Sequence, residues 1–185
     1  MDKSVEKKQI KRWKVCLCAI LTLLSVSLIA WIFSNSLQTA EESSAQSGSV
    51  VDKIQALFKR IAPNSFIATA VGEDYHTLHK IIRILAHFCE FALLGALLVW
   101  SCRAYTDRGI WLLIPLALIL LVPVVDELLQ SFTGGRAMQF VDILVDVAGG
   151  VCGGAFAWFT IFIGKKISKR KGAKNGEREL TSRVD

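Results

Sequence analysis

Four long apolar segments are the feature that most constrains what this chain can fold into. They cover residues 14–33, 81–100, 110–130 and 140–163. A helix of about 20 apolar residues is long enough to cross the hydrocarbon core of a bilayer. The mean hydropathy is +0.44 although the formal net charge is +6, so the charged residues are concentrated between and beside these segments. The pattern predicts an all-α integral membrane protein, a bundle of four transmembrane helices.

The first apolar segment could in principle be a cleaved signal peptide. Signal peptides have an apolar core of about 7–15 residues and a small-residue cleavage site. The uncharged stretch that begins at Val15 is longer than such a core, and no Ala-x-Ala site follows it. We therefore predict that the segment is retained as the first transmembrane helix.

The distribution of basic residues predicts the orientation in the membrane. If the tails 1–14 and 165–185 and the short link after residue 100 share one side, that side holds 16 Lys and Arg residues and the other side holds 6. Loops rich in Lys and Arg stay on the cytoplasmic side. We therefore expect two basic cytoplasmic tails, a transmembrane domain over residues 15–164, and extracytoplasmic positions for the loop 35–80 and for the loop around Arg136.

The basic tails also indicate which partners to expect. Binding to nucleic acid requires basic residues on one folded face, interleaved with aromatic side chains. Here the basic residues lie at the two chain ends, beside apolar runs, so no nucleic-acid partner is expected. The C-terminal tail is expected to contact anionic membrane lipid and to be disordered at its end.

The extracytoplasmic loop 35–80 holds one amphipathic stretch. Its apolar residues recur at helical spacing and are Val50, Val51, Ile54, Leu57, Phe58 and Ile61. Pro63 ends the pattern, which therefore predicts a helix. Such a helix can lie flat in the membrane interface or pack against the transmembrane bundle, and the sequence favours neither placement.

Ionisable residues interrupt the apolar segments at positions where placing a charge in the bilayer costs free energy. Glu90 is predicted to lie well inside the hydrocarbon, where a carboxylate indicates function by default. His87 shares its helix face, because the two residues are three apart. On the predicted topology, three helices bring polar groups toward one extracytoplasmic cavity. The candidate ligand-binding residues are His87, Glu90, Asp126, Glu127, Gln130, Arg136 and Asp142, with Asp146 beneath them.

So many carboxylates cannot all be ionised at low dielectric. Some must be protonated, paired with Arg83 or Arg136, or bound to a cation. The structural alternative is that they cap helix ends or form hydrogen bonds between helices. No motif identifies a cofactor or a metal, since the chain has neither an HExxH sequence nor a serine-nucleophile elbow.

Small residues predict how the fourth helix packs. Gly149 with Gly153, and Gly150 with Gly154, form two overlapping GxxxG patterns. This spacing lets helix backbones approach closely without a hydrophobic driving force. The five cysteines lie in or beside apolar segments without a CxxC pair, and we expect them to be apolar helix residues rather than metal ligands or disulfides.

Four short motifs resemble the VanZ-like family of bacterial membrane proteins. They are His87-Phe88-Cys89-Glu90, Asp126-Glu127-Leu128-Leu129-Gln130, Gly135-Arg136 and Asp142-Ile143-Leu144-Val145-Asp146. The resemblance begins near Trp31 and continues to the end of the fourth apolar segment. Phe91 and Gly134 depart from the family, which usually has Tyr and Pro there. The resemblance implies a multi-pass protein of the bacterial cell membrane, and the named family member is associated with low-level resistance to teicoplanin. This glycopeptide binds a cell-wall precursor at the outer membrane face.

Three kinds of function are compatible with these features. The sequence favours a cell-envelope protein whose acidic cavity binds a lipid-linked or cationic ligand. The alternative is an intramembrane enzyme, metal-dependent in one version, that acts on a lipid-linked cell-wall intermediate. Glu90, Asp126 or Glu127 would then be the base and His87 the proton shuttle or ligand. A transporter that relays protons through Glu90 and Asp146 would need a dimer, because four helices are few for alternating access.

Overall fold

All secondary structure in the described part of the chain is helical. The computed structural model describes residues 3–133 and 138–184. Its elements are α1 (Lys3–Ser36), α2 (Ala40–Ile61), α3 (Phe66–Thr69), α4 (Glu73–Tyr105), the 3-10 helix η1 (Gly109–Leu112), α5 (Leu113–Phe132) and α6 (Phe140–Val184). Helices α1, α4, α5 and α6 contain stretches that are long and apolar enough to cross a membrane. The predicted all-α membrane architecture with four spans is therefore confirmed.

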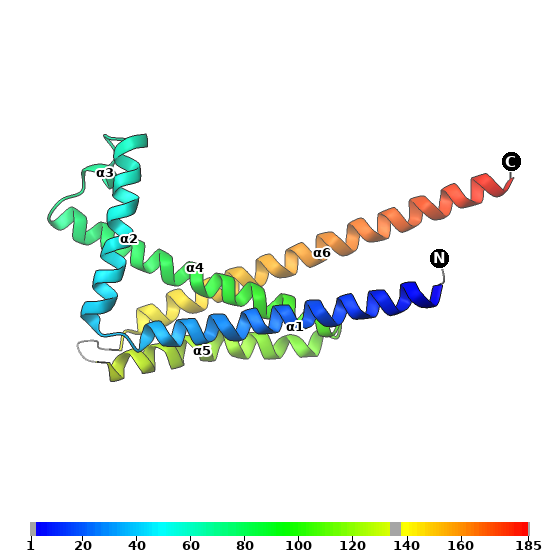
Figure 1. The fold of residues 1–185 in the computed structure, drawn as a ribbon, viewed down its shortest axis with the longest axis horizontal. Helices are drawn as coiled ribbons and strands as arrows, with labels where there is room; N and C mark the ends of the chain where they lie inside the picture. The colour runs from blue at the N-terminus through cyan, green and yellow to red at the C-terminus, as the bar shows by residue number, and fades with distance from the viewer. Residues whose placement is uncertain (1–2, 134–137, 185) are drawn as a thin grey trace.

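The four spanning helices form a bundle in which successive spans run in opposite directions (Figure 1). The start of α1 and the end of α6 lie at the same end of the bundle. The helices α2 and α3, the end of α5 and the start of α6 lie at the opposite end, which we call the α2 end. Helix α4 contacts each of the other three spanning helices and packs most extensively against α6. It is therefore the centre of the bundle.

The spanning helices extend beyond the apolar segments. Helix α4 begins at Glu73 and ends at Tyr105, whereas the sequence predicted a helix over 81–100. Its first two turns are mostly polar and exposed, and Leu78 anchors them because it is buried against Val51 of α2 and Ala70 at the end of α3. Helix α6 continues to Val184, through the tail whose end was predicted to be disordered. Its tail contains no proline and is rich in Lys and Arg, which favour helix.

Helix α2 begins ten residues earlier than the amphipathic pattern predicted. Thr39 and Glu42 form a capping box that fixes this start. The backbone N–H of Thr39 donates to the Glu42 carboxylate, and this hydrogen bond lowers the pKa of Glu42 below its usual value. Glu42 therefore contributes to stability above its usual pKa, and the contribution is lost as the pH falls through the lowered value.

Helix α2 packs on the bundle rather than lying free of it. It crosses the first turns of α4 (Figure 1). Val51 is fully buried in a small cluster with Ala70 and Leu78. Gln55 is also buried, and its side-chain amide donates to the Ala70 carbonyl at 2.7 Å. Of the two placements that the sequence left open, the structure shows packing on the bundle, and this packing holds α2 over the ends of α1 and α4.

Glycines bring α4 and α6 into backbone contact, as the GxxxG patterns predicted. A Cβ atom on Gly149 would overlap the carbonyl oxygen of Phe88, and one on Gly153 would overlap that of Ala92. On the α4 side, a Cβ atom on Gly95 would overlap the Gly150 carbonyl. The five cysteines are all free thiols within the helices, which agrees with their predicted role as apolar helix residues.

Candidate functional site

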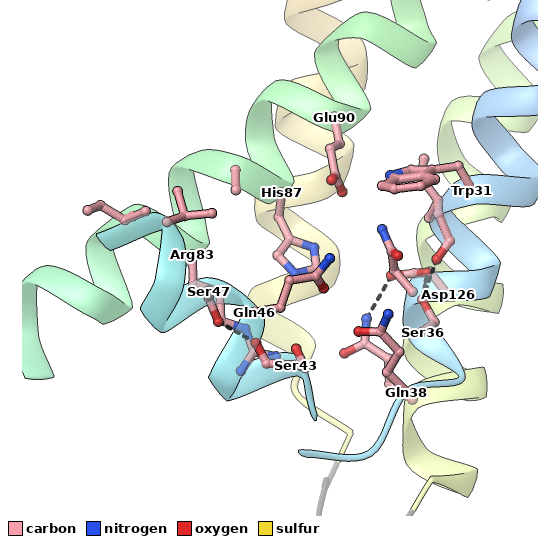
Figure 2. Close-up of a pocket in the computed structure, with 16 residues that line it drawn as sticks. Trp31, Ser36, Gln38, Ser43, Gln46, Ser47, Arg83, His87, Glu90 and Asp126 are labelled. Carbon is pink, nitrogen blue, oxygen red and sulfur yellow. Dashed lines mark hydrogen bonds between the residues drawn. The ribbon is translucent and has the colours of Figure 1, made fainter. Parts of the chain in front are cut away.

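A cavity of about 200 Å³ lies at the α2 end of the bundle. Figure 2 shows side chains from α1, α2, α4 and α5 around this space. The polar residues on its wall are Trp31, Asn35, Ser36 and Gln38 from the α1 end, Ser43, Gln46 and Ser47 from α2, Arg83, His87 and Glu90 from α4, and Asp126 and Gln130 from α5. Four separate helices thus supply polar groups to one cavity.

One imidazole and two carboxylates converge beside this cavity. They belong to His87 on α4, Asp126 on α5 and Asp146 on α6, and one possible ligand atom of each lies within 4.8 Å of the others. The Nδ1 atom of His87 is 3.7 Å from Oδ1 of Asp146. The two aspartates are 1% and 2% exposed, whereas the side chain of His87 is 28% exposed. This group, which we call the His–Asp–Asp cluster, therefore reaches from the buried interior to the cavity.

Neighbouring polar groups hold Asp126 in place. The hydroxyl of Ser36 donates to Oδ1 of Asp126, and the side-chain amide of Gln130 donates to Oδ2 at 2.8 Å. Gln130 lies one turn after Asp126 on α5, so this hydrogen bond stays within one helix face. Ser36 comes from α1 and joins that helix to α5.

The close contact between α4 and α6 explains why Asp146 reaches His87. Gly149 lies against the carbonyl of Phe88, the residue that follows His87. Asp146 lies about one helical turn before Gly149, so it is carried to the level of His87. The glycine pattern and the buried carboxylate are thus parts of one helix interface.

The wall of the cavity carries charges of both signs. Glu90 lies beside the indole of Trp31, with Arg83 nearer to α2 (Figure 2). Arg83 makes no ion pair with any residue in the part of the chain that the structure describes. Its guanidinium group is therefore available to an anionic group in the cavity. The acidic groups of the His–Asp–Asp cluster come from α5 and α6.

The candidate residues predicted from sequence fall into three groups. His87, Glu90, Asp126 and Gln130 line the cavity, and Asp146 lies against His87. Glu127 is buried but accepts a hydrogen bond from the backbone N–H of Gln139, so it caps the start of α6. Asp142 is half-buried and does not line the cavity. Arg136 lies outside the residues that the structure describes. The hydrogen bond of Glu127 to Gln139 agrees with the structural alternative of helix capping.

Sequence reasoning missed the contributions of α1 and α2 to the cavity. Ser36 lies three residues past the predicted end of the first helix, and its partner Asp126 is 90 positions away. Ser43, Gln46 and Ser47 share one face of α2 at spacings of three and four. That spacing is a signal in the sequence, but only the crossing of α2 over α4 turns this face toward the cavity.

Comparison with known proteins identifies the family. The family model described as VanZ/LLP1 matches residues 21–163. The chain belongs to the VanZ/LLP1 family. No curated protein matches the chain, and no solved structure does. The resemblance seen in the sequence motifs is thus confirmed. The region matched to the VanZ/LLP1 family contains every residue of the cavity wall and the whole His–Asp–Asp cluster.

Proposed function

We propose that this VanZ/LLP1 protein lies in the bacterial cell membrane with its cavity outward and lowers susceptibility to glycopeptides such as teicoplanin. It does so by binding the polar part of a lipid-linked cell-wall intermediate, or a cationic ligand, in the cavity. The observation that supports this most is the cavity at the α2 end, whose wall carries the buried carboxylate of Asp126 and the guanidinium group of Arg83, which forms no ion pair within the described residues. Such a site is complementary to a ligand that carries both ionic and hydrogen-bonding groups.

The orientation rests on the basic residues. The bundle end that holds both termini also carries the basic tails and the link with Arg103 and Arg108. Because Lys and Arg favour the cytoplasmic side, both termini are cytoplasmic and the α2 end is extracytoplasmic. A glycopeptide acts on cell-wall precursors outside the membrane, and in this orientation the cavity faces the same side.

Cysteine labelling tests the orientation. In a background with the five native cysteines replaced by alanine, Ser44→Cys is expected to react with a membrane-impermeant maleimide on intact cells. Lys166→Cys is expected to react only after the membrane is opened. Both positions are exposed, so access across the membrane decides the result. The reverse labelling pattern would show that the orientation is wrong.

Isosteric changes test the link between cavity and resistance. In a glycopeptide-susceptible host, the wild type is expected to raise the minimal inhibitory concentration of teicoplanin. Glu90→Gln and Asp126→Asn are expected to remove that gain, because each deletes a charge from the cavity while keeping side-chain shape. Asp74→Asn, an exposed carboxylate on the same helix as Glu90, is the matched control and should keep the gain.

Equal membrane levels of all four proteins are measured alongside by immunoblot. If Glu90→Gln and Asp126→Asn protect as well as the wild type, the cavity is not the site of function. If the wild type itself gives no gain, the proposed role in glycopeptide resistance is wrong for this chain.

A second candidate function is an intramembrane, metal-dependent enzyme that acts on a lipid-linked cell-wall intermediate. The His–Asp–Asp cluster favours it, because imidazole nitrogen and carboxylate oxygen are the donor types that hold many catalytic metal ions. Glu90 is then the candidate base on the cavity wall, because Glu127 already accepts a hydrogen bond from the backbone N–H of Gln139. Incubating the purified protein with such an intermediate separates the two functions, because a binding protein leaves the intermediate unchanged in the mass spectrum.

A further inference from the structure

We propose that His87, Asp126 and Asp146 bind one divalent transition-metal ion, with its open coordination position facing the cavity. The proposal rests on the cavity being the functional site, and it names the cation that this site holds. The three side chains come from three different helices and bring their ligand atoms within 4.8 Å of one another. Zn²⁺ and Mn²⁺ are the ions whose ligand preferences such a set of nitrogen and oxygen donors meets.

The burial of Asp146 calls for a neutralising group. Asp126 and Asp146 are almost completely buried in the middle of the bundle end. No Lys or Arg within the described residues forms an ion pair with Asp146. A buried carboxylate without a cation is costly at low dielectric. A divalent ion beside Asp146 supplies that cation.

One oxygen of Asp146 lacks a hydrogen bond. The Oδ1 atom accepts none from the residues that the structure describes, although Asp146 is only 2% exposed. Nδ1 of His87 lies 3.7 Å from this oxygen, which is beyond hydrogen-bond distance. Buried carboxylate oxygens without a hydrogen bond are rare in folded proteins. This oxygen is aimed at the cluster, where an ion would be its missing partner.

The distances in the cluster are close to those of a metal site. Ligand atoms lie about 2.0–2.2 Å from Zn²⁺, so two ligands of one tetrahedral ion are about 3.5 Å apart. The 3.7 Å between Nδ1 of His87 and Oδ1 of Asp146 is close to this separation. The other separations in the cluster lie within 4.8 Å, so binding an ion needs a shift of roughly 1 Å at the end of a side chain, which a rotation of that side chain provides.

Hydrogen bonds from neighbouring side chains orient one of the proposed metal ligands. Metal-binding carboxylates are themselves oriented by hydrogen bonds from neighbouring groups. Asp126 receives one from Ser36 and one from Gln130. With three protein ligands, the fourth position remains for water or for a ligand group in the cavity. An ion held in this way polarises a bound phosphoryl or carbonyl oxygen and makes bound water more acidic.

Metal binding is tested on the purified full-length chain in detergent, carrying an affinity tag without histidine. The protein is stripped with a chelator, dialysed against Zn²⁺ or Mn²⁺, and analysed for metal and protein content. We expect about one ion per chain for the wild type and at least about 100-fold weaker binding for Asp146→Asn and His87→Gln, since even the loss of a group that only orients a ligand costs about 10–100-fold. Ser36→Ala, which removes the hydroxyl that donates to Asp126, is expected to weaken binding by about 10–100-fold.

Asp142→Asn is the matched control. Asp142 lies one turn before Asp146 on α6 but outside the cluster, so this variant should bind metal like the wild type. Co²⁺ substitution provides a second measurement, because its visible bands should appear in the wild type and Asp142→Asn and be absent in Asp146→Asn. Circular dichroism and gel filtration show whether each variant is folded. Asp146→Glu, which restores a carboxylate, should recover part of the binding.

The outcomes separate this proposal from the proposed function. If the folded wild type binds no metal, or if Asp146→Asn binds as much as the wild type, the metal site is wrong and protons balance the buried carboxylates. In that case a loss of resistance in Glu90→Gln would still support the cavity as the site of function. Conversely, stoichiometric metal lost in Asp146→Asn supports the metal site even if the wild type does not change teicoplanin susceptibility.

Discussion

Replacing Gly153 with leucine is expected to destabilise the bundle by about 3 kcal/mol or more. The Cβ atom alone would overlap the carbonyl oxygen of Ala92, which is main chain and cannot rotate away. Helices α4 and α6 would have to separate, and the largest helix contact in the bundle would be weakened along its length. Thermal unfolding of the detergent-solubilised protein, followed by circular dichroism, measures the effect.

Gly164→Leu is the matched control on the same helix. A Cβ atom at Gly164 meets no other atom within 4 Å, so this variant should unfold at the temperature of the wild type. If Gly153→Leu and Gly164→Leu are equally stable, α4 and α6 are not in backbone contact. The loss in Gly153→Leu should also be accompanied by the loss of metal binding, because the same interface carries Asp146 to His87.

Replacing Phe91 with alanine is expected to cost about 2–4 kcal/mol of unfolding free energy. Phe91 is 1% exposed and packs between α1, α4 and α5 in a cluster with Ile32, Leu94 and Val122. In water-soluble proteins a buried Phe→Ala change costs about 3–5 kcal/mol. The expected value is lower here, because the unfolded helices also keep Phe91 in an apolar medium and mainly the packing contacts are lost.

Phe159→Ala removes the same atoms from a lipid-facing position. Phe159 is 60% exposed on α6, so its loss creates no internal cavity, and a change within about 0.5 kcal/mol is expected. The two variants are compared in one unfolding titration. A Phe91→Ala protein as stable as Phe159→Ala would mean that this part of the core is not packed as the structure shows.

Two neighbouring residues show where sequence reasoning stops. Asp126 and Glu127 both follow the apolar stretch of α5 and were placed together in the predicted site. In an α-helix, adjacent residues point about 100° apart, since 3.6 residues make one turn. Asp126 therefore meets Ser36 and Gln130 at the cavity, whereas Glu127 meets the backbone of Gln139 at the start of α6. The rotation of α5 in the bundle decides which acid reaches the cavity.

The four spans and their close glycine packing can be predicted from local sequence. A bilayer requires about 20 apolar residues per helix, and a backbone contact requires residues without a side chain, so both features appear as local patterns. Which polar groups meet depends instead on how the helices pack. Ser36, His87, Asp126 and Asp146 lie on four different helices. Their convergence depends on helix rotation and crossing, which result from packing between segments far apart in the chain.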